Sequence, residues 1–524
     1  MNFLHEKPLS MAKNNKWPLM VFFFLAIQGF FFVQDYGISW DEPRQREIGQ
    51  VSYNYVRKIN SDLNTFSDRD YGVAVELPMV VVEYALGLKD PGSIYLLRHT
   101  LTHLIFLLGA FFLYLLVKRL AQSEMLGIAA VLILVLSPRI YGHSFFNSKD
   151  IPFLAVYLIT LYWLVRAISV RTIPSFLILA VCLGVLIDIR ISGLMMLGVA
   201  LLGFTLFVLI PHENITRLRK AGLLSMTIII ALMVVYFCWP FLWKDPFGAI
   251  QLAFHNMAHF RWNESVLFSG NWFPADNLPR YYAMKWFLIS TPPAFLLLGT
   301  IGVGVFLFEM IKGLFVTSVW SKNLGYILCF SAFVGPLLAV FVLHSVVYDD
   351  WRHLYFVYPP FIVFVIRGVQ VILDAINKKM AYGLFSVVLL FQLNYLWAHR
   401  GLQHLYFNSF VGHKEEKLKL SYEMDYWGLS YKQLFEYLAQ KDKSDEVKVY
   451  VMNLPGFFNL STLPPMERKR FKFVDKDQHP DYVLTNHRWH PTEYSEYKDM
   501  KFFSVRTENS TVASLYCLKP KQAK

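Results

Sequence analysis

The sequence predicts a polytopic α-helical membrane protein with about eleven spanning helices and a small C-terminal α/β domain outside the membrane. Three observations support this fold class. The 524 residues are 55% hydrophobic and only 17% charged, whereas soluble proteins carry about 25% charged residues. Apolar residues gather in blocks of roughly 17 to 25, long enough to cross a hydrocarbon layer. The last part of the chain, residues 399–524, is polar by contrast.

Each apolar block is assigned to one span. The first, Trp17–Val33, is too long for the apolar core of a signal peptide and lacks a small-residue cleavage site, so it is expected to stay as a helix. Residues 173–210 can be divided in more than one way, and losing one span would invert the topology of everything after it. The expected spans are 17–34, 95–117, 124–137, 151–166, 173–189, 191–210, 221–240, 287–311, 324–345, 354–374 and 381–398.

Basic residues occupy alternate loops between these spans. This distribution follows the positive-inside rule and predicts a cytoplasmic N-terminus and an extracytoplasmic C-terminal domain. The net charge of +12 does not indicate nucleic-acid binding, because no basic run is interleaved with aromatics. The loops assigned to the cytoplasm contain Lys118 and Arg119, Arg166 and Arg171, Lys312 and Lys322, and Lys378 and Lys379.

The C-terminal domain, residues 399–524, is expected to mix strands and helices. Val447–Met452 and Tyr482–Thr485 have strand-like composition, and Tyr431–Ala439 has the period of an amphipathic helix. Three of the four cysteines lie in apolar blocks, which leaves Cys517 alone in this domain and rules out a disulfide framework there. The spanning module is therefore predicted over 1–398 and the α/β domain over 399–524.

Two adjacent carboxylates follow the first span. Asp41 and Glu42 lie beside Trp40 and Pro43, at a water–lipid boundary. A carboxylate in such a place suits a general base that removes a proton from an acceptor hydroxyl. The alternative is an ordinary helix start, since acidic residues are favoured in a first helical turn.

The second outside loop concentrates different polar groups within twelve residues. Arg139 and Lys149 are cations that can hold a phosphate, and His143, Asn147 and Asp150 accompany them at the mouth of an apolar helix. An ordinary loop that flanks a span could have a similar composition, so both interpretations stay open at this point.

Two further polar groups interrupt apolar sequence. Asp188 and Arg190 separate two apolar blocks, where ionisable groups are costly unless they pair or line a wet cavity; they could also pair with each other. Arg352 and His353 precede a late span and face either a cavity or the membrane interface. The loop 240–286 is rich in aromatics and is expected to lie in the interface. No His/Cys cluster has zinc spacing and no nucleotide-type glycine loop is present.

At these positions the sequence resembles the GT-C superfamily of membrane glycosyltransferases, in particular the bacterial branch related to protein O-mannosyltransferases and to the aminoarabinose transferases of lipid A. The resemblance covers nearly the whole chain. It rests on the order and spacing of short motifs: Ser39–Pro43, Pro138–Pro152 and Trp351-Arg352-His353, with Tyr71-Gly72, Glu76 and Asp425–Ser430.

The resemblance implies a hexosyl- or pentosyltransferase of the bacterial inner membrane. The donor would be a sugar linked to polyprenyl phosphate, and the acceptor a protein, a lipid or a glycan. Transfer would invert the anomeric centre. Some members bind a divalent metal and others do not; because no second acidic residue stands beside Asp150, no metal is firmly expected.

Residue roles carried over from the resemblance fall into three groups. Asp41 is implied as the general base, with Glu42 as its neighbour and Asp150 as the second acidic residue of the site. The donor phosphate would be held by Arg139, His143, Lys149, Arg190 and Arg352. The site would also be lined by Tyr71, Glu76, Asn147 and His353.

The alternative function is a lipid or solute transporter without transferase activity. Transporters also bury ionisable groups, but they tend to show repeated halves and interrupted helices at matching positions. This sequence has no such repeat, and its polar groups gather in loops. A non-catalytic subunit with the same fold is disfavoured by the intact Asp41-Glu42 pair.

Overall fold

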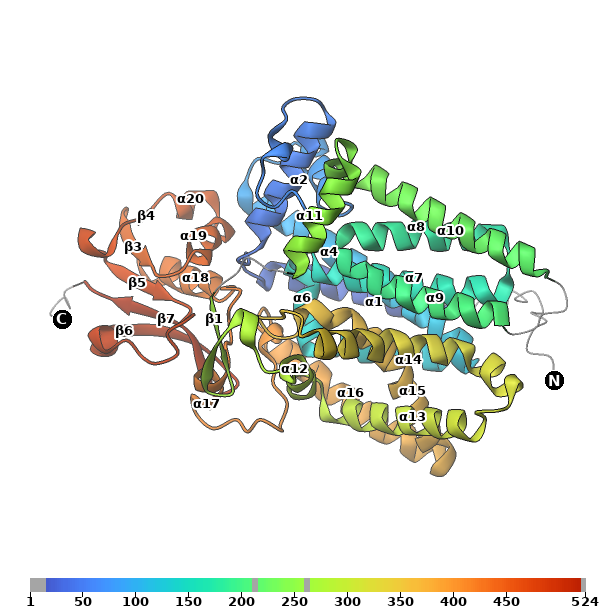
Figure 1. Cartoon of the computed structure of the whole chain (residues 1–524). Helices are drawn as coiled ribbons and strands as arrows, with labels where there is room; N and C mark the ends of the chain where they lie inside the picture. Colours follow the sequence, from blue (N-terminus) through green and yellow to red (C-terminus); the bar gives the residue numbers. More distant parts are fainter. Residues whose placement is uncertain (1–15, 210–214, 259–263, 520–524) are drawn as a thin grey trace.

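The computed structural model describes residues 16–209, 215–258 and 264–519; residues 1–15 of the expected cytoplasmic end and 520–524 of the expected C-terminal domain lie outside this range. A bundle of long helices occupies one side of the molecule, and a region of strands and short helices (399–519, the C-terminal region) packs against one end of the bundle (Figure 1). The connection between α13 and α14 lies at the opposite end of the bundle.

A helix occupies every predicted span. Nine helices in the described residues are long and apolar enough to cross a membrane, or ten if the bent pair α5–α6 is one span, and α8 is an apolar helix of only 17 residues. Together with the bent pair and α8, the nine long helices account for the eleven spans expected. The bundle helices are α1 (Trp17–Phe32), α4 (Pro91–Ala121), α5 (Glu124–Val135), α6 (Pro138–Phe146), α7 (Asp150–Val170), α8 (Ile173–Ile189), α9 (Leu194–Leu209), α10 (Arg217–Cys238), α13 (Pro293–Lys312), α14 (Thr317–Leu343), α15 (Tyr358–Ala375) and α16 (Lys378–Ala398).

Prolines break the bundle helices where the site is built. Pro138 disfavours helical backbone at Ser137, which is extended, and so α5 and α6 meet at a bend of 72°. The predicted span 287–311 is wrong as a single helix for the same reason. Pro292 and Pro293 separate α12 (Tyr282–Ser290) from α13, with Thr291 extended between them.

The core of the bundle lies along α7 and α15, whose side chains are buried on nearly every face. Close helix packing depends on small residues: a Cβ on Gly109 of α4 would lie 2.8 Å from Ala155 of α7. Small residues that let helix backbones approach in this way are typical of membrane bundles.

The loops at the site end of the bundle contain short elements of their own. These are α2 (Glu42–Val56), α3 (Glu76–Ala85), α11 (Pro246–Ala258), the hairpin of β1 (Ser265–Phe268) and β2 (Asn271–Pro274), and η6 (Arg352–Val357). Helix α11, in the aromatic loop, packs Ala249 and Ala253 against Trp239, while Phe247 on its other face is 88% exposed. Helix α11 therefore buries small residues and leaves apolar side chains, among them Phe247, exposed.

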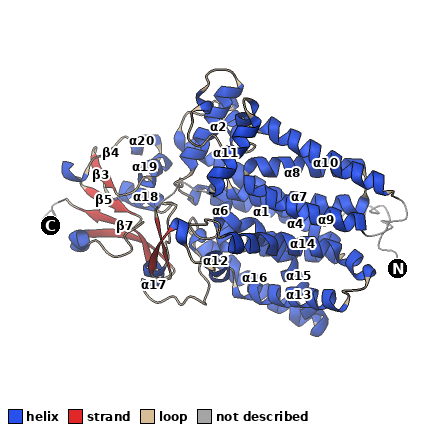
Figure 2. Ribbon diagram, in the orientation of Figure 1, coloured by secondary structure: helices blue, strands red, loops and turns tan. Residues whose placement is uncertain are grey.

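The C-terminal region contains a five-stranded mixed sheet of order β4-β3-β5-β7-β6 (Figure 2). Strand β3 pairs in parallel with β4 and β5, and β7 runs antiparallel to β5 and β6. The predicted strands and helix are confirmed as β3, β5 and α18. All four cysteines are free. The elements are α17 (Lys417–Ser421), α18 (Tyr431–Lys441), β3 (Val447–Val451), α19 (Pro455–Asn459), α20 (Pro465–Arg468), β4 (Phe471–Phe473), β5 (Tyr482–Thr485), β6 (Lys501–Thr507) and β7 (Ser510–Cys517).

Candidate active site

A cavity of about 320 Å³ lies where the site end of the bundle meets the C-terminal region. Its walls come from the first outside loop, the starts of α7 and η6, the end of α8 and the C-terminal region. Six of the residues singled out from the sequence line it: Asp41, Tyr71, Lys149, Arg190, Arg352 and His353.

Asp41 occupies the N-cap position of α2 but makes no capping hydrogen bond. Its carboxylate instead accepts a hydrogen bond from Arg352 Nη1 at 3.1 Å, and its side chain is 39% exposed. The helix-start interpretation of the Asp41-Glu42 pair therefore describes the backbone correctly, while the Asp41 side chain faces the cavity.

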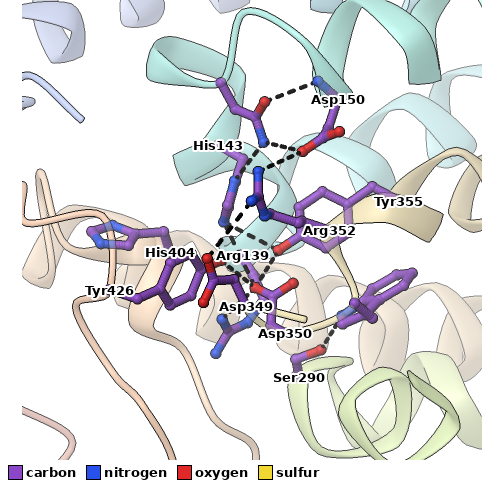
Figure 3. A network of polar contacts seen from close by, with 12 residues as sticks. Arg139, His143, Asp150, Ser290, Asp349, Asp350, Arg352, Tyr355, His404 and Tyr426 are labelled. Carbon is purple, nitrogen blue, oxygen red and sulfur yellow. Dashed lines mark hydrogen bonds and ion pairs between the residues drawn. The ribbon is translucent and has the colours of Figure 1, made fainter. Parts of the chain in front are cut away.

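Asp150 and Asp41 both lie near Arg352. Arg352 Nη1 lies 3.6 Å from Asp150 Oδ2, and Arg190 donates a short hydrogen bond to the other oxygen of Asp150. Asp150 is buried, so it contacts the cavity only through these two arginines. Figure 3 shows Asp150 beside Arg352. The two loops that carry the predicted acids thus converge on one guanidinium.

Lys149 is placed differently from the arginines. Its ammonium lies 3.2 Å from the centroid of the Tyr71 ring, and within the described residues it forms no ion pair. Burial and the nearby Arg190 hold the pKa of Lys149 well below its usual value. Burial also lowers the pKa of Arg190, to about 10, and raises that of Tyr71 to about 12. An anion that binds here would stabilise the charge on Lys149.

Asp188 and Arg190 do not pair with each other. Asp188 is buried and accepts a hydrogen bond from the backbone N–H of Ala74 at 2.6 Å. The chain at Gly72 passes so close that a Cβ there would lie 1.6 Å from the Asp188 carbonyl oxygen. Asp188 thereby fixes the loop that presents Tyr71 to Lys149.

Glu42 and Glu76 lie outside the cavity. Glu42 accepts hydrogen bonds from the backbone N–H of Ser39 and from His99 Nε2, both at 2.7 Å. Glu76 pairs with the buried Arg98 and accepts a hydrogen bond from Ser148 at 2.7 Å. Both carboxylates therefore hold loops beside the site and do not face its contents.

A hydrogen-bond chain behind the cavity contains His143 and Asn147. The Asn147 amide donates to Asp150 Oδ2 (2.9 Å) and to His143 Nδ1 (3.2 Å). On its other side, His143 Nε2 donates to the Tyr355 hydroxyl (3.1 Å), which donates to Asp350 (2.7 Å). The chain thus connects Asp150 to Asp350, and Figure 3 shows these groups together.

Arg139 is the ion-pair partner of Asp350 and does not line the cavity. Its guanidinium donates to Asp350 Oδ2 at 3.1 Å and to the Tyr406 carbonyl at 2.8 Å, and it lies over the Trp286 ring. Tyr426 of the C-terminal region also donates to Asp350, at 2.8 Å. Burial raises the pKa of Asp350, although Arg139 acts in the opposite direction.

The sequence motifs did not indicate Asp349 and Asp350, although both lie within three residues of Arg352. Both have left-handed backbone, with φ of 52° and 61°, a conformation that aspartate adopts more readily than most residues. Two consecutive residues of this kind turn the chain so that Asp350 points into the buried network while Arg352 faces the cavity. The adjacent Asp pair before Trp351 was the available signal.

The C-terminal region supplies one wall of the cavity, in which Trp427 belongs to the Asp425–Ser430 motif, whereas no motif indicated Arg488 and Trp489. Arg488 donates to Asp349 at 3.3 Å, and its guanidinium carbon lies 5.1 Å from the centroid of the Trp40 ring and 4.8 Å from that of the Trp489 ring. The backbone N–H of Trp40 donates to the backbone carbonyl of Trp427 at 3.0 Å. The residue before Asp41 is thus held by the C-terminal region. Over residues 16–209, 215–258 and 264–519, no group of three or more His, Cys, Asp or Glu residues could hold a metal ion.

Residues 99–239 match the family model described as dolichyl-phosphate-mannose-protein mannosyltransferase. The predicted resemblance is confirmed. The matched segment runs from α4 to α10 and includes Arg139, His143, Lys149, Asp150 and Arg190. A comparison with curated protein sequences found no match.

Solved structures with a similar course of the chain include two transferases. The structure of ArnT from Cupriavidus metallidurans bound to undecaprenyl phosphate has 12% identity and a TM-score of 0.48, with 96% of this chain and 99% of that chain covered. The apo oligosaccharyltransferase of Archaeoglobus fulgidus has 9% identity and a TM-score of 0.47, with 89% and 65% covered.

Proposed function

We propose that this GT-C-like protein is a glycosyltransferase whose cavity transfers a sugar from a polyprenyl-phosphate donor to an acceptor hydroxyl or amide, with Asp41 as the general base. The observation that carries the proposal is that one partly exposed carboxylate, Asp41, faces the same cavity as Lys149, Arg190 and Arg352. The family match over residues 99–239 supports the reaction class.

The reaction requires an acid–base group and an anion site on opposite sides of the anomeric carbon. The acceptor heteroatom forms a bond to that carbon, and its proton passes to Asp41. The bond from the anomeric carbon to the phosphate oxygen breaks, and its electron pair stays on the departing polyprenyl phosphate. Attack opposite the leaving group inverts the centre. Lys149 and Arg190 stabilise the charge that develops on the phosphate.

The other predicted site residues take supporting roles in this proposal. Asp150 orients Arg190 and Arg352, and Glu42 fixes the turn before Asp41. Arg139 and His143 are not proposed as phosphate ligands, because Arg139 pairs with Asp350 and His143 is hydrogen-bonded to Tyr355. Their role is to hold the loop that carries Lys149.

The donor class follows the likeness to a protein whose structure contains undecaprenyl phosphate. We place the cavity at the extracytoplasmic face of the inner membrane, with the N-terminus cytoplasmic, because the basic loops alternate with the loops that build the site. The sugar is a hexosyl or pentosyl group, and its acceptor is a protein, lipid or glycan of the cell envelope.

The proposal is tested with purified protein and the lipid-linked sugar that accumulates in cells lacking it, identified by mass spectrometry of extracted polyprenyl phosphates. Asp41→Asn should lower kcat by about 10²- to 10⁴-fold, the usual contribution of a general base. Asp35→Asn is the matched control, because Asp35 pairs with Arg400 outside the cavity and should leave the rate near parental. Parental activity of Asp41→Asn would refute the assignment.

A further inference from the structure

Arg352 is shared by three carboxylates at the centre of the cavity. Its Nη1 lies 3.1 Å from Asp41 Oδ2 and 3.6 Å from Asp150 Oδ2, and its Nη2 lies 3.6 Å from Asp349 Oδ2. Only the contact with Asp41 is within hydrogen-bonding distance. Arg352 is therefore bound directly to the proposed base and more loosely to its other two acidic neighbours.

The guanidinium of Arg352 has hydrogen-bonding capacity left over. Its Nε is buried and has no hydrogen-bond partner in the part of the chain that the structure describes. Its side chain is only 7% exposed, and its guanidinium carbon lies 4.7 Å from the centroid of the Trp427 ring. An arginine has five N–H donors arranged to match a phosphate or carboxylate, so a phosphate in the cavity could engage Arg352 more completely than Asp41 does.

The cations around Arg352 favour a phosphate over Asp41 as its partner. Lys149 has no ion pair among the described residues, and Arg190 is bound to Asp150, the same carboxylate that lies 3.6 Å from Arg352. A phosphate drawn to these two cations would come within reach of Arg352. An oxygen of Asp41 carries a share of one negative charge, whereas a phosphate offers several anionic oxygens to the same fork.

We propose that Arg352 holds Asp41 in the donor-free protein, and that the donor phosphate takes this guanidinium over and so releases Asp41 to act as the base. This inference rests on the proposed function. While Asp41 Oδ2 accepts the hydrogen bond from Arg352, that oxygen is occupied by the guanidinium and is not available to the proton of the acceptor. The donor must then bind before the acceptor can be deprotonated.

This exchange makes Asp41 a competitor of the donor phosphate for one side chain. Removing the charge of Asp41 should therefore tighten the binding of polyprenyl phosphate, although it slows transfer. This tightening should depend on the presence of Arg352. A general change in the electrostatic field of the cavity would instead act on the phosphate whatever residue occupies position 352.

The experiment is a double-mutant cycle on the binding of undecaprenyl phosphate to the purified full-length protein in nanodiscs. Asp41→Asn should lower Kd by about 5-fold or more, the lower end of typical coupling between sites. In the Arg352→Gln background the same change should leave Kd unaltered. Asp68→Asn, which removes a charge from the same cavity without touching Arg352, should tighten binding less than Asp41→Asn.

Each result of the double-mutant cycle either supports or overturns the exchange of Arg352 between Asp41 and the phosphate. Equal tightening in both backgrounds, or none in either, would overturn the exchange while leaving the proposed function intact. Parental protein that does not bind undecaprenyl phosphate at all would overturn the proposed function itself. If Arg352→Gln does not fold, a structure with undecaprenyl phosphate bound gives the answer: Arg352 still donating to Asp41 would exclude the exchange, and Arg352 donating to the phosphate would support it.

Discussion

The buried ion pair of Arg139 and Asp350 should make the fold sensitive to the loss of either partner, because each charge is removed from water and is compensated by the other. Arg139 is 3% exposed and Asp350 is 1% exposed. Asp350 accepts hydrogen bonds from Arg139, Tyr355 and Tyr426, which belong to three separate parts of the chain. We predict that breaking the pair from either side is costly, whereas replacing both partners costs clearly less than the two single changes added together.

The magnitude follows from leaving one charge without its partner. Removing one member of a buried ion pair costs about 3–5 kcal/mol of stability. Asp350→Asn is the preferred perturbation because asparagine tolerates the left-handed backbone observed at this position. Arg139→Gln should cost a similar amount. The double variant should cost about half of the summed single effects or less, since neither charge is then left alone.

The assay is unfolding of the purified protein by SDS in mixed micelles, followed by tryptophan fluorescence. The two single variants and the double variant are compared with the parental protein. Strictly additive losses would show that Arg139 and Asp350 do not act as a pair. Binding of undecaprenyl phosphate gives a second comparison: a loss of affinity in folded Arg139→Gln as large as in Lys149→Ala would mean that Arg139 binds the donor after all.

Two further predictions concern the cation end of the cavity. Because the pKa of Lys149 is lowered, its charge and the affinity for undecaprenyl phosphate should fall as pH rises through that lowered value, below the pH of about 10.4 typical of lysine. Binding titrations across pH test this prediction. A pH dependence of affinity that persists in Lys149→Arg, whose charge does not titrate, would contradict it. Gly72→Ala should displace the Tyr71 loop, cost about 1–3 kcal/mol of stability and weaken donor binding. Gly198→Ala, with open space around its added Cβ, should have none of these effects. The prediction is wrong if unfolding and binding measurements give the same result for both variants.

Hydropathy predicted the helices well, because the length of an apolar block is set by the thickness of the membrane. It failed where proline chemistry interrupted a block, as at Pro292 and Pro293. Each expected span corresponds to a helix or to the bent pair α5–α6, although α8 is short because it stops at Ile189, where Arg190 is extended. A periodic pattern contains little information about such local stops.

The candidate site was predicted as a set of residues more accurately than as a geometry. Asp41, Lys149 and Arg352 were identified because charged groups beside apolar blocks are rare and costly. Nothing in the sequence distinguishes Lys149, which faces the cavity, from Arg139, which lies behind it. That difference depends on the bend at Pro138 and on the acid that each cation meets, and both are properties of the folded chain.

The C-terminal region completes the cavity, which explains why short motifs in the spanning module cannot define the site alone. Tyr426 donates to Asp350, and Arg488 donates to Asp349. These two aspartates immediately precede Trp351 and Arg352, so the turn that aims Arg352 at Asp41 is fixed on one side by the C-terminal region. A small shift of this region would therefore change the distance between Arg352 and Asp41 without altering any residue in the spanning module. We infer that the C-terminal region acts on the chemistry through the placement of one arginine, in addition to shaping the wall that an acceptor meets.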